Sequence, residues 1–209
     1  VRGCAQMSRM NISAYDGVTL GPALGVGGTS VVHRCEWRGQ IVVVKRLRDQ
    51  SAVQKKAFRR ELAILAAVQH RNIVLSKGFY ESPKLLALYM ELCEGGCIFD
   101  LVHRSDLDLL LSQTCKMLSD VADAMEYLHG LQPQIIHRDL KSPNLLLVDP
   151  LRGKLDVPRV KLCDFGSARA IKAGSAKSGW MALTKNAGTC HWSAPEVASG
   201  QYDEKVDVY

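Results

Sequence analysis

The sequence predicts an α+β fold, in which a small part rich in strands precedes a larger part that is mainly helical. Two apolar runs, residues 41–44 and 85–90, have the length and composition of buried strands. Residues 58–68 and 114–129 instead repeat their apolar side chains with the period of an α-helix. The 209 residues suffice for one large or two small domains.

The composition narrows the class of partner. An apolar content of 47% and a charged content of 23% are ordinary for a soluble globular protein. The formal charge of +6 comes from basic residues that are scattered along the sequence, which disfavours nucleic acid as a partner. A nucleoside triphosphate needs only a few local cations and is compatible with this charge.

The seven cysteines are odd in number and form no Cys-x-x-Cys motif. Cys93 and Cys97 lie close together but have no matching Cys/His set downstream, so a zinc site is disfavoured. Unpaired thiols indicate a reducing compartment, and we expect a cytoplasmic protein. No apolar run approaches the ~20 residues of a membrane span, and no signal peptide is recognised. Because the first residue is Val1, we expect that the start has been cut, which leaves upstream targeting segments open.

Residues 1–17 are expected to form a linker or tail, with strand signals beginning near residue 18. Residues 24–32 then form a glycine-rich turn. Glycines such as Gly25 and Gly27 let a hairpin come close to a ligand, and its exposed N–H groups can bind phosphates. A plain hairpin is the alternative.

The first buried run ends at Lys45, and the helical segment that follows carries a carboxylate in its apolar stripe. The stripe is made of Phe58, Leu62, Leu65 and Val68. Glu61 falls between these residues, where a carboxylate is costly unless a cation meets it. Lys45 is the obvious partner, and the alternative is a glutamate at the stripe edge that reaches solvent.

The middle of the chain is expected to contain further secondary structure and a glycine-containing loop. Residues 70–74 predict a turn and a strand, and residues 91–96, with two glycines, interrupt the chain after the second apolar run. The helix over 114–129 is expected to bury one face, formed by Leu118, Val121, Ala122, Met125 and Leu128. The opposite face carries Lys116, Asp120 and Asp123.

The polar loop over residues 137–144 follows two β-branched apolar residues and brings Asp139, Lys141 and Asn144 close together. A strand signal follows at 145–148, and after a turn-rich hairpin a second one ends in Asp164. Two carboxylates and a carboxamide at adjacent strand ends can hold divalent cations through hard oxygen ligands. Taken singly, such residues are more often parts of solvated turns.

The loop His137-Arg138-Asp139-Leu140-Lys141 with Asn144 matches the catalytic loop of eukaryotic protein kinases, and Asp164-Phe165-Gly166 matches their metal-binding motif. The chain therefore resembles a eukaryotic protein kinase over about residues 18–209. Gly25, Gly27 and Val32 fit the family's glycine-rich loop, with Ser30 in place of its third glycine. Lys45 fits the Val-Ala-Ile-Lys motif, with Val43 in place of alanine. The motif Leu-Lys-Ser-Pro-Asn at residues 140–144 and the turn Trp37-Arg38-Gly39 most resemble those of the tyrosine-kinase-like (TKL) group.

The resemblance implies a bilobal protein-kinase-like fold. A small lobe over residues 18–90 would hold a five-stranded antiparallel sheet plus one helix, and residues 91–209 would form the hinge and a partial, C-terminally incomplete helical lobe. Asp207 would support the catalytic loop. We expect this 209-residue chain by itself to be insoluble or inactive.

The resemblance also implies ATP and Mg²⁺ as cofactors. Catalytic roles fall to Asp139, Lys141, Lys45 and Glu61, and the metal ligands are Asn144 and Asp164. The nucleotide-binding residues are Leu24, Gly25, Gly27, Val32, Val43, Lys45, Met90, Glu91, Cys93 and Leu146. Lys141 and Thr189 resemble serine/threonine kinases, so the expected partners are protein substrates with Ser or Thr hydroxyls, in signalling.

Two alternatives stay open. Ser30 and Val43 would suit a pseudokinase that acts as a scaffold or nucleotide-binding module, and a dual-specificity or tyrosine kinase would share most motifs. Residues 167–185 would form the activation loop, where Arg138 would meet a phosphorylated side chain. The candidate phosphosites are Ser175, Ser178 and Thr184.

Overall fold

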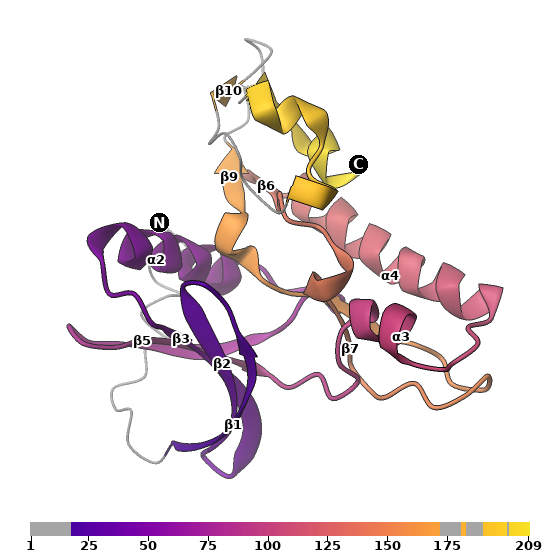
Figure 1. Cartoon of the computed structure of the whole chain (residues 1–209). Helices are drawn as coiled ribbons and strands as arrows, with labels where there is room; N and C mark the ends of the chain where they lie inside the picture. The colour runs from indigo at the N-terminus through magenta and orange to yellow at the C-terminus, as the bar shows by residue number, and fades with distance from the viewer. Residues whose placement is uncertain (1–17, 172–180, 183–189, 200) are drawn as a thin grey trace. The chain divides into compact units, whose positions relative to one another are not determined.

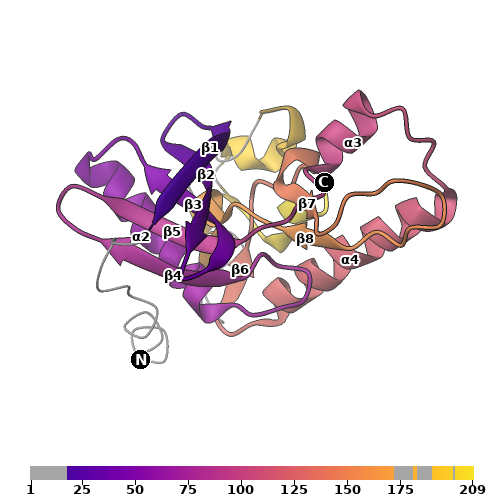
Figure 2. The same ribbon diagram turned by 90° about the horizontal axis from the view of Figure 1, so that it is seen from below.

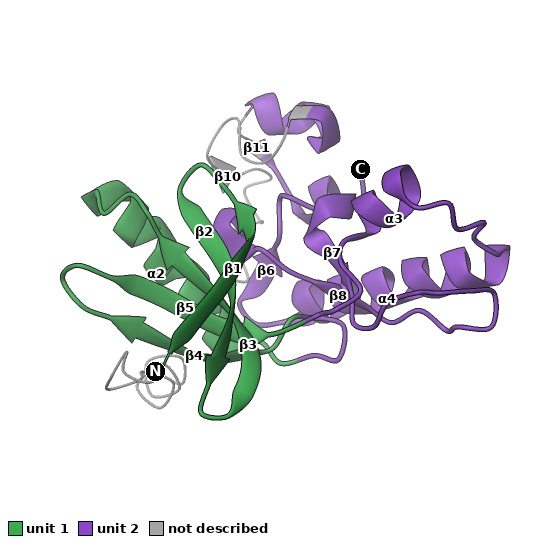
Figure 3. Cartoon of the chain, turned by 60° about the horizontal axis from the view of Figure 1, so that its bottom comes forward, with its two compact units in different colours: residues 1–69, 74–92 green, residues 70–73, 93–209 purple. Residues whose placement is uncertain are grey.

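The computed structural model describes residues 18–171, 181–182, 190–199 and 201–209 (Figures 1 and 2). The chain divides into two compact units, shown in different colours in Figure 3. The first, here the sheet unit, comprises residues 1–69 and 74–92. The second, here the helical unit, comprises residues 70–73 and 93–209.

In the residues that the structure describes, the sheet unit contains a five-stranded antiparallel sheet in the order β1-β2-β3-β5-β4 and one helix, α2, as predicted. The strands are β1 (Thr19–Val26), β2 (Ser30–Trp37), β3 (Gln40–Leu47), β4 (Ser76–Glu81) and β5 (Leu86–Glu91). The β2–β3 turn lies at Arg38 and Gly39, whose φ angles of 54° and 73° are typical of a tight hairpin turn.

Helix α2 (Ala52–Ala67) begins after Ser51, whose side chain caps the N–H of Gln54, and buries the predicted apolar stripe. On β3, Val42 and Val44 pack into a core cluster with Trp37 and Tyr89. Ile41 was expected to be buried with them but is 41% exposed, because it lies next to the hairpin turn.

The described residues of the helical unit form two helices and short strand pairs (Figure 1). The helices are α3 (Ile98–Arg104) and α4 (Leu111–Gly130). The antiparallel pairs are β6 (Gln134–Ile136) with β9 (Arg169–Ile171), β7 (Leu145–Leu147) with β8 (Val160–Leu162), and β10 (Met181–Ala182) with β11 (Gln201–Tyr202). Short 3-10 turns are η1 (Ser142–Asn144), η2 (Phe165–Ser167), η4 (Cys190–Trp192), η5 (Pro195–Ser199) and η6 (Glu204–Asp207). Helix α4 lies alongside the β7–β8 hairpin (Figure 2), and Met117 packs with Leu147 and Val160.

Helix α4 differs from its prediction in both start and face. It begins at Leu111 rather than Thr114. Leu118, expected on the buried face, is 64% exposed, whereas Asp120, expected on the polar face, is 3% exposed. The buried face is formed by Gln113, Met117, Asp120, Ala124, Met125 and Leu128. Asp120 tolerates burial because its carboxylate accepts hydrogen bonds from Lys116 Nζ at 2.5 Å and from the N–H of Val160 at 2.9 Å.

The strand predicted within residues 70–74 is also corrected. Ile73 makes only an isolated bridge to Leu162, and β4 starts at Ser76. The segment is held instead by Asn72, whose backbone oxygen accepts from the N–H of Leu162 at 2.8 Å and whose side chain donates to the carbonyl of Val160 at 2.9 Å. These bonds place residues 70–73 in the helical unit.

Candidate active site

In the sheet unit, Lys45 and Glu61 form the predicted ion pair. Strand β3 carries Lys45 and helix α2 carries Glu61, and the Nζ–Oε1 distance is 2.6 Å. The two side chains are 13% and 4% exposed, so Glu61 is not a stripe-edge residue that reaches solvent. The carboxylate therefore fixes the lysine ammonium at the end of a buried strand.

The glycine-rich turn joins β1 to β2, and Gly27 N–H donates to the carbonyl of Ser30 at 2.8 Å. A Cβ atom built on Gly25 or Gly28 would meet no other atom within 4 Å. The packing of the protein itself therefore does not require glycine at these two positions. The open space beside this backbone fits the close approach of a ligand such as a phosphate group.

Two further predicted nucleotide-binding residues lie opposite each other in this unit, because Val43 of β3 pairs with Met90 of β5. The next residue, Glu91, is tied to Leu75 twice. Its N–H donates to the Leu75 carbonyl at 3.0 Å, and its carboxylate accepts from the Leu75 N–H at 2.6 Å. Its N–H is thus already engaged within the sheet unit.

In the helical unit, the loop after β6 brings Asp139, Lys141 and Asn144 together, as predicted. Lys141 Nζ lies 2.8 Å from Asp139 Oδ2. Asn144 Nδ2 donates to the backbone oxygen of Asp139 at 2.8 Å and to its carboxylate at 3.1 Å. Since its amide nitrogen faces Asp139, the amide oxygen of Asn144 is the atom that could ligate a cation.

Asp207 anchors this loop from η6, as expected. Its buried carboxylate accepts hydrogen bonds from the N–H of His137 at 2.8 Å and from that of Arg138 at 2.7 Å. His129 Nε2 lies 3.0 Å from the same carboxylate. Arg138 has a positive φ of 67°, which is uncommon for a residue with a side chain, and the two bonds to Asp207 hold it there.

The guanidinium of Arg138 is buried and ties two more segments to the loop. Nε donates to the carbonyl of Ser167 at 2.7 Å, and Nη1 donates to the hydroxyl of Tyr202 at 2.7 Å. The candidate phosphosites Ser175, Ser178 and Thr184, and also Thr189, lie outside the described residues. The pairing of Arg138 with a phosphorylated side chain therefore stays a prediction.

His137 links the loop to the Asp164 turn, a role that the sequence analysis missed. Its ring is fully buried, and this burial lowers its pKa, so the imidazole is neutral. Nδ1 accepts from the Asp139 N–H at 3.3 Å, and Nε2 donates to the carbonyl of Cys163 at 3.1 Å. The ring also meets Phe165 edge-on, with a centroid distance of 5.0 Å.

Asp164 follows β8 in the left-handed conformation, with φ 62° and ψ 77°, and its carboxylate caps η2. The N–H of the preceding Cys163 donates to the carbonyl of Asn144 at 2.9 Å, which continues the β7–β8 pairing by one step. Asn144 and Asp164 therefore stand at the same end of the β7–β8 hairpin. Their oxygens are the hard ligands that Mg²⁺ prefers.

Strand β8, which leads to Asp164, is clamped by two buried polar side chains. Asp120 accepts from the N–H of Val160, and Asn72 donates to its carbonyl. Neither role was predicted from the sequence, because the partners lie 40 and 88 residues away along the chain. A buried polar residue is signalled in the sequence only where it interrupts the apolar stripe of a helix, as Glu61 does.

The predicted site residues thus form two clusters, one in each unit. Lys45, Glu61 and the glycine-rich turn belong to the sheet unit, whereas Asp139, Asn144 and Asp164 belong to the helical unit. Cys93 and Leu146 are also residues of the helical unit. That both clusters act on one nucleotide stays a prediction.

A sheet with one helix, a buried Lys–Glu pair and the two polar loops define the catalytic domain of protein kinases. A model of the protein kinase domain family matches residues 18–209. The chain belongs to the protein kinase family.

Three relatives show which protein kinases the chain is similar to in sequence. The chain is 40% identical over 191 residues to the serine/threonine-protein kinase CTR1 of Arabidopsis thaliana, covering 89% of this chain and 22% of the relative. It is 37% identical over 198 residues to the probable serine/threonine-protein kinase SIS8 of the same plant, covering 93% and 18%. It is 36% identical over 200 residues to human mitogen-activated protein kinase kinase kinase 7, covering 93% and 30%.

These relatives are of the TKL type, which confirms the group indicated by the sequence. The chain spans between 18% and 30% of their lengths. In the described part of the chain, no helix is both long and apolar enough to cross a membrane.

Proposed function

We propose that the protein is a serine/threonine kinase that transfers the γ-phosphate of ATP to Ser or Thr hydroxyls of protein substrates in signalling. The observation that carries this proposal is the preorganised loop that contains Asp139, Lys141 and Asn144. The carboxylate of Asp207 holds this loop through hydrogen bonds to its backbone. Membership of the protein kinase family implies ATP-dependent phosphoryl transfer. The relatives' names support Ser/Thr as the acceptor.

The nucleotide would be held mainly by the sheet unit. Gly25 and Gly27 would let the glycine-rich turn cover the phosphates closely, and Lys45, fixed by Glu61, would orient the α- and β-phosphates. The adenine ring would be enclosed by side chains and backbone of Leu24, Val32, Val43, Met90, Glu91, Cys93 and Leu146.

The helical unit would carry the chemistry. Asp139 would accept or orient the proton of the substrate hydroxyl, and Lys141 would approach the transferred phosphoryl group. Asn144 and Asp164 would hold Mg²⁺, which when bound neutralises charge on the phosphates. Phosphoryl transfer needs positioning and charge neutralisation more than covalent help, and fixed side chains of this kind supply both.

The test is phosphate transfer from γ-labelled ATP to a protein substrate by the intact protein that contains this chain. We expect labelled phosphoserine and phosphothreonine, and a loss of about 100-fold or more in rate for Asp139→Asn. A rate for Asp139→Asn within a few-fold of the unchanged protein would contradict the role of Asp139.

Ser30 and Val43 are the two departures that favour a nucleotide-binding pseudokinase. That alternative predicts stabilisation of the intact protein by Mg²⁺-ATP with no transfer of label. Phosphotyrosine in the labelled product would instead indicate a dual-specificity or tyrosine kinase.

A further inference from the structure

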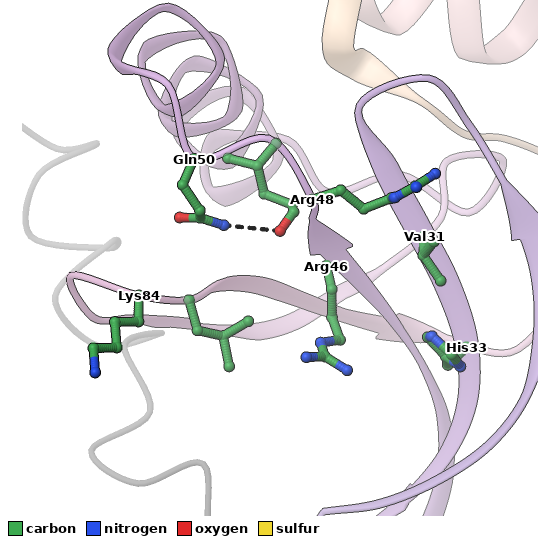
Figure 4. Close-up of a pocket in the computed structure, with 8 residues that line it drawn as sticks. Val31, His33, Arg46, Arg48, Gln50 and Lys84 are labelled. Atoms are coloured by element: carbon green, nitrogen blue, oxygen red, sulfur yellow. Dashed lines mark hydrogen bonds between the residues drawn. The ribbon is translucent and has the colours of Figure 1, made fainter.

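The sheet unit has a cavity of about 430 Å³ whose wall is unusually basic (Figure 4). The side chains that define it, here the basic cavity, come from β2, the end of β3 and the β4–β5 turn. They are His33, Arg46, Arg48, Gln50 and Lys84, with Val31, Leu47 and Leu85 as apolar neighbours. None of the described residues that line it is acidic.

The basic cavity lies on a different face of the sheet from the catalytic lysine. Side chains alternate along a strand, so Arg46 points to the opposite face from its neighbour Lys45. Arg46 shares its face with Val42 and Val44, which pack in the core cluster around Trp37 and Tyr89. A molecule bound on this face would leave the Lys45–Glu61 pair untouched.

The surroundings of the basic cavity add positive charge. Lys55 in the first turn of α2 donates to the carbonyl of Pro83 at 2.9 Å, which places its ammonium beside Lys84. The first turn of α2 contains no acidic residue, although the helix dipole favours one there. Among the described residues, Arg48 and Lys84 make no ion pair, whereas Arg59 of the same unit is paired with Glu81. Unbalanced cations around a concave surface attract an anion.

We propose that the basic cavity is a docking site for a phosphorylated segment of a partner protein. A phosphate monoester carries up to two negative charges and three acceptor oxygens, which match the guanidinium of Arg48 and the ammonium of Lys84. The flanking Val31 and Leu85 suit the aliphatic part of a peptide rather than a bare ion. Such a site would bring substrates or regulators to the kinase by a contact separate from phosphoryl transfer.

The experiment uses the intact protein and a degenerate phosphoserine peptide library, with the same library unphosphorylated as reference. We expect the phosphorylated library to bind at least 10-fold more tightly. The double variant Arg48→Glu, Lys84→Glu should lose this preference, and both residues are exposed, so the fold should persist. Lys56→Glu, which makes the same kind of charge change on an exposed part of α2 outside the cavity, should keep it.

Phosphotransfer activity on a peptide without a phosphate should be unchanged in the double variant, which separates this proposal from the proposed function. The proposal is overturned if the two libraries bind equally, or if the preference survives in the double variant. It is also overturned if inorganic phosphate competes at the same concentration as the phosphopeptides. Loss of binding to phosphatidylserine vesicles in the double variant, without any peptide binding, would assign the cavity to a membrane surface instead.

Discussion

At the scale of single residues, the Lys45–Glu61 pair shows how a buried charge is tolerated. Each charge is nearly withdrawn from water, and the 2.6 Å contact compensates for the lost hydration. Removing one partner takes this contact away from the other buried charge. Removing both leaves no charge of the pair to be compensated.

We therefore expect Glu61→Ala to lower the free energy of unfolding by about 3 kcal/mol or more. The double variant Lys45→Met, Glu61→Ala should recover a large part of this loss. Urea denaturation of the intact protein measures both values. A cost below about 1 kcal/mol for Glu61→Ala would mean that the pair contributes little to stability.

The neutral imidazole of His137 predicts a dependence of stability on pH. Burial lowers its pKa in the folded protein, so below about pH 6.5 the unfolded chain binds a proton that the folded protein does not. The stability contribution is thus complete above the unfolded pKa and is lost as the pH falls toward the lower folded pKa. The expected loss is up to about 1.4 kcal/mol per pH unit.

The measurement is urea denaturation at several pH values between 5 and 8 for the unchanged protein and for His137→Phe. The difference between the two stability curves should carry the slope below pH 6.5. His103→Gln, at an exposed position of α3, should follow the unchanged protein. Identical slopes for all three proteins would show that His137 does not titrate on unfolding.

At the scale of elements, strand β8 is positioned by side chains from distant parts of the chain. Asn72 donates to the carbonyl of Val160, and Asp120 accepts from its N–H. Asp164 follows four residues later, just after the strand ends. The clamp therefore couples α4 and residues 70–73 to the proposed metal ligand. A short strand of this kind has few bonds of its own.

Asn72→Ala and Asp120→Ala should each lower stability by about 1–3 kcal/mol, because each leaves a buried backbone group unsatisfied. Each should also raise the Mg²⁺ concentration that gives half-maximal kinase activity, because Asp164 loses its fixed position. Lys116→Ala removes a partner of Asp120 but keeps the bond to Val160, and should have a smaller effect. If stability falls while the Mg²⁺ requirement is unchanged, the clamp is structural only.

Helix α4 shows what the sequence can and cannot predict about an element. The helical spacing of its apolar residues was clear in the sequence, and the helix is present. Met125 and Leu128 of the predicted face are buried, but Leu118 is exposed. Apolar residues occur around much of the helix, so the pattern does not single out one direction. Asp120 is buried because of Val160, a partner that no local pattern announces.

At the scale of the whole molecule, the sequence predicted the class of fold, and at the site it predicted which side chains lie close together within each unit. Short motifs announce these contacts, because a charged residue inside an apolar helical stripe needs a partner and residues of one loop lie close together. Lys45 with Glu61, and Asp139 with Lys141 and Asn144, follow from this. The supporting contacts of His137 and Arg138 did not, because they join segments that are brought together only by folding.

The proposed function requires the cluster in the sheet unit and the cluster in the helical unit to act on one ATP molecule. The most direct test measures the rate of phosphate transfer from γ-labelled ATP with Mg²⁺ by the intact protein and by two single variants. Lys45→Met in the sheet unit and Asp164→Asn in the helical unit should each reduce the rate by about 100-fold or more. The matched controls Lys56→Met and Asp149→Asn, both exposed, should retain it. A rate within a few-fold of the unchanged protein for either Lys45→Met or Asp164→Asn would contradict the claim that the two clusters form one active site.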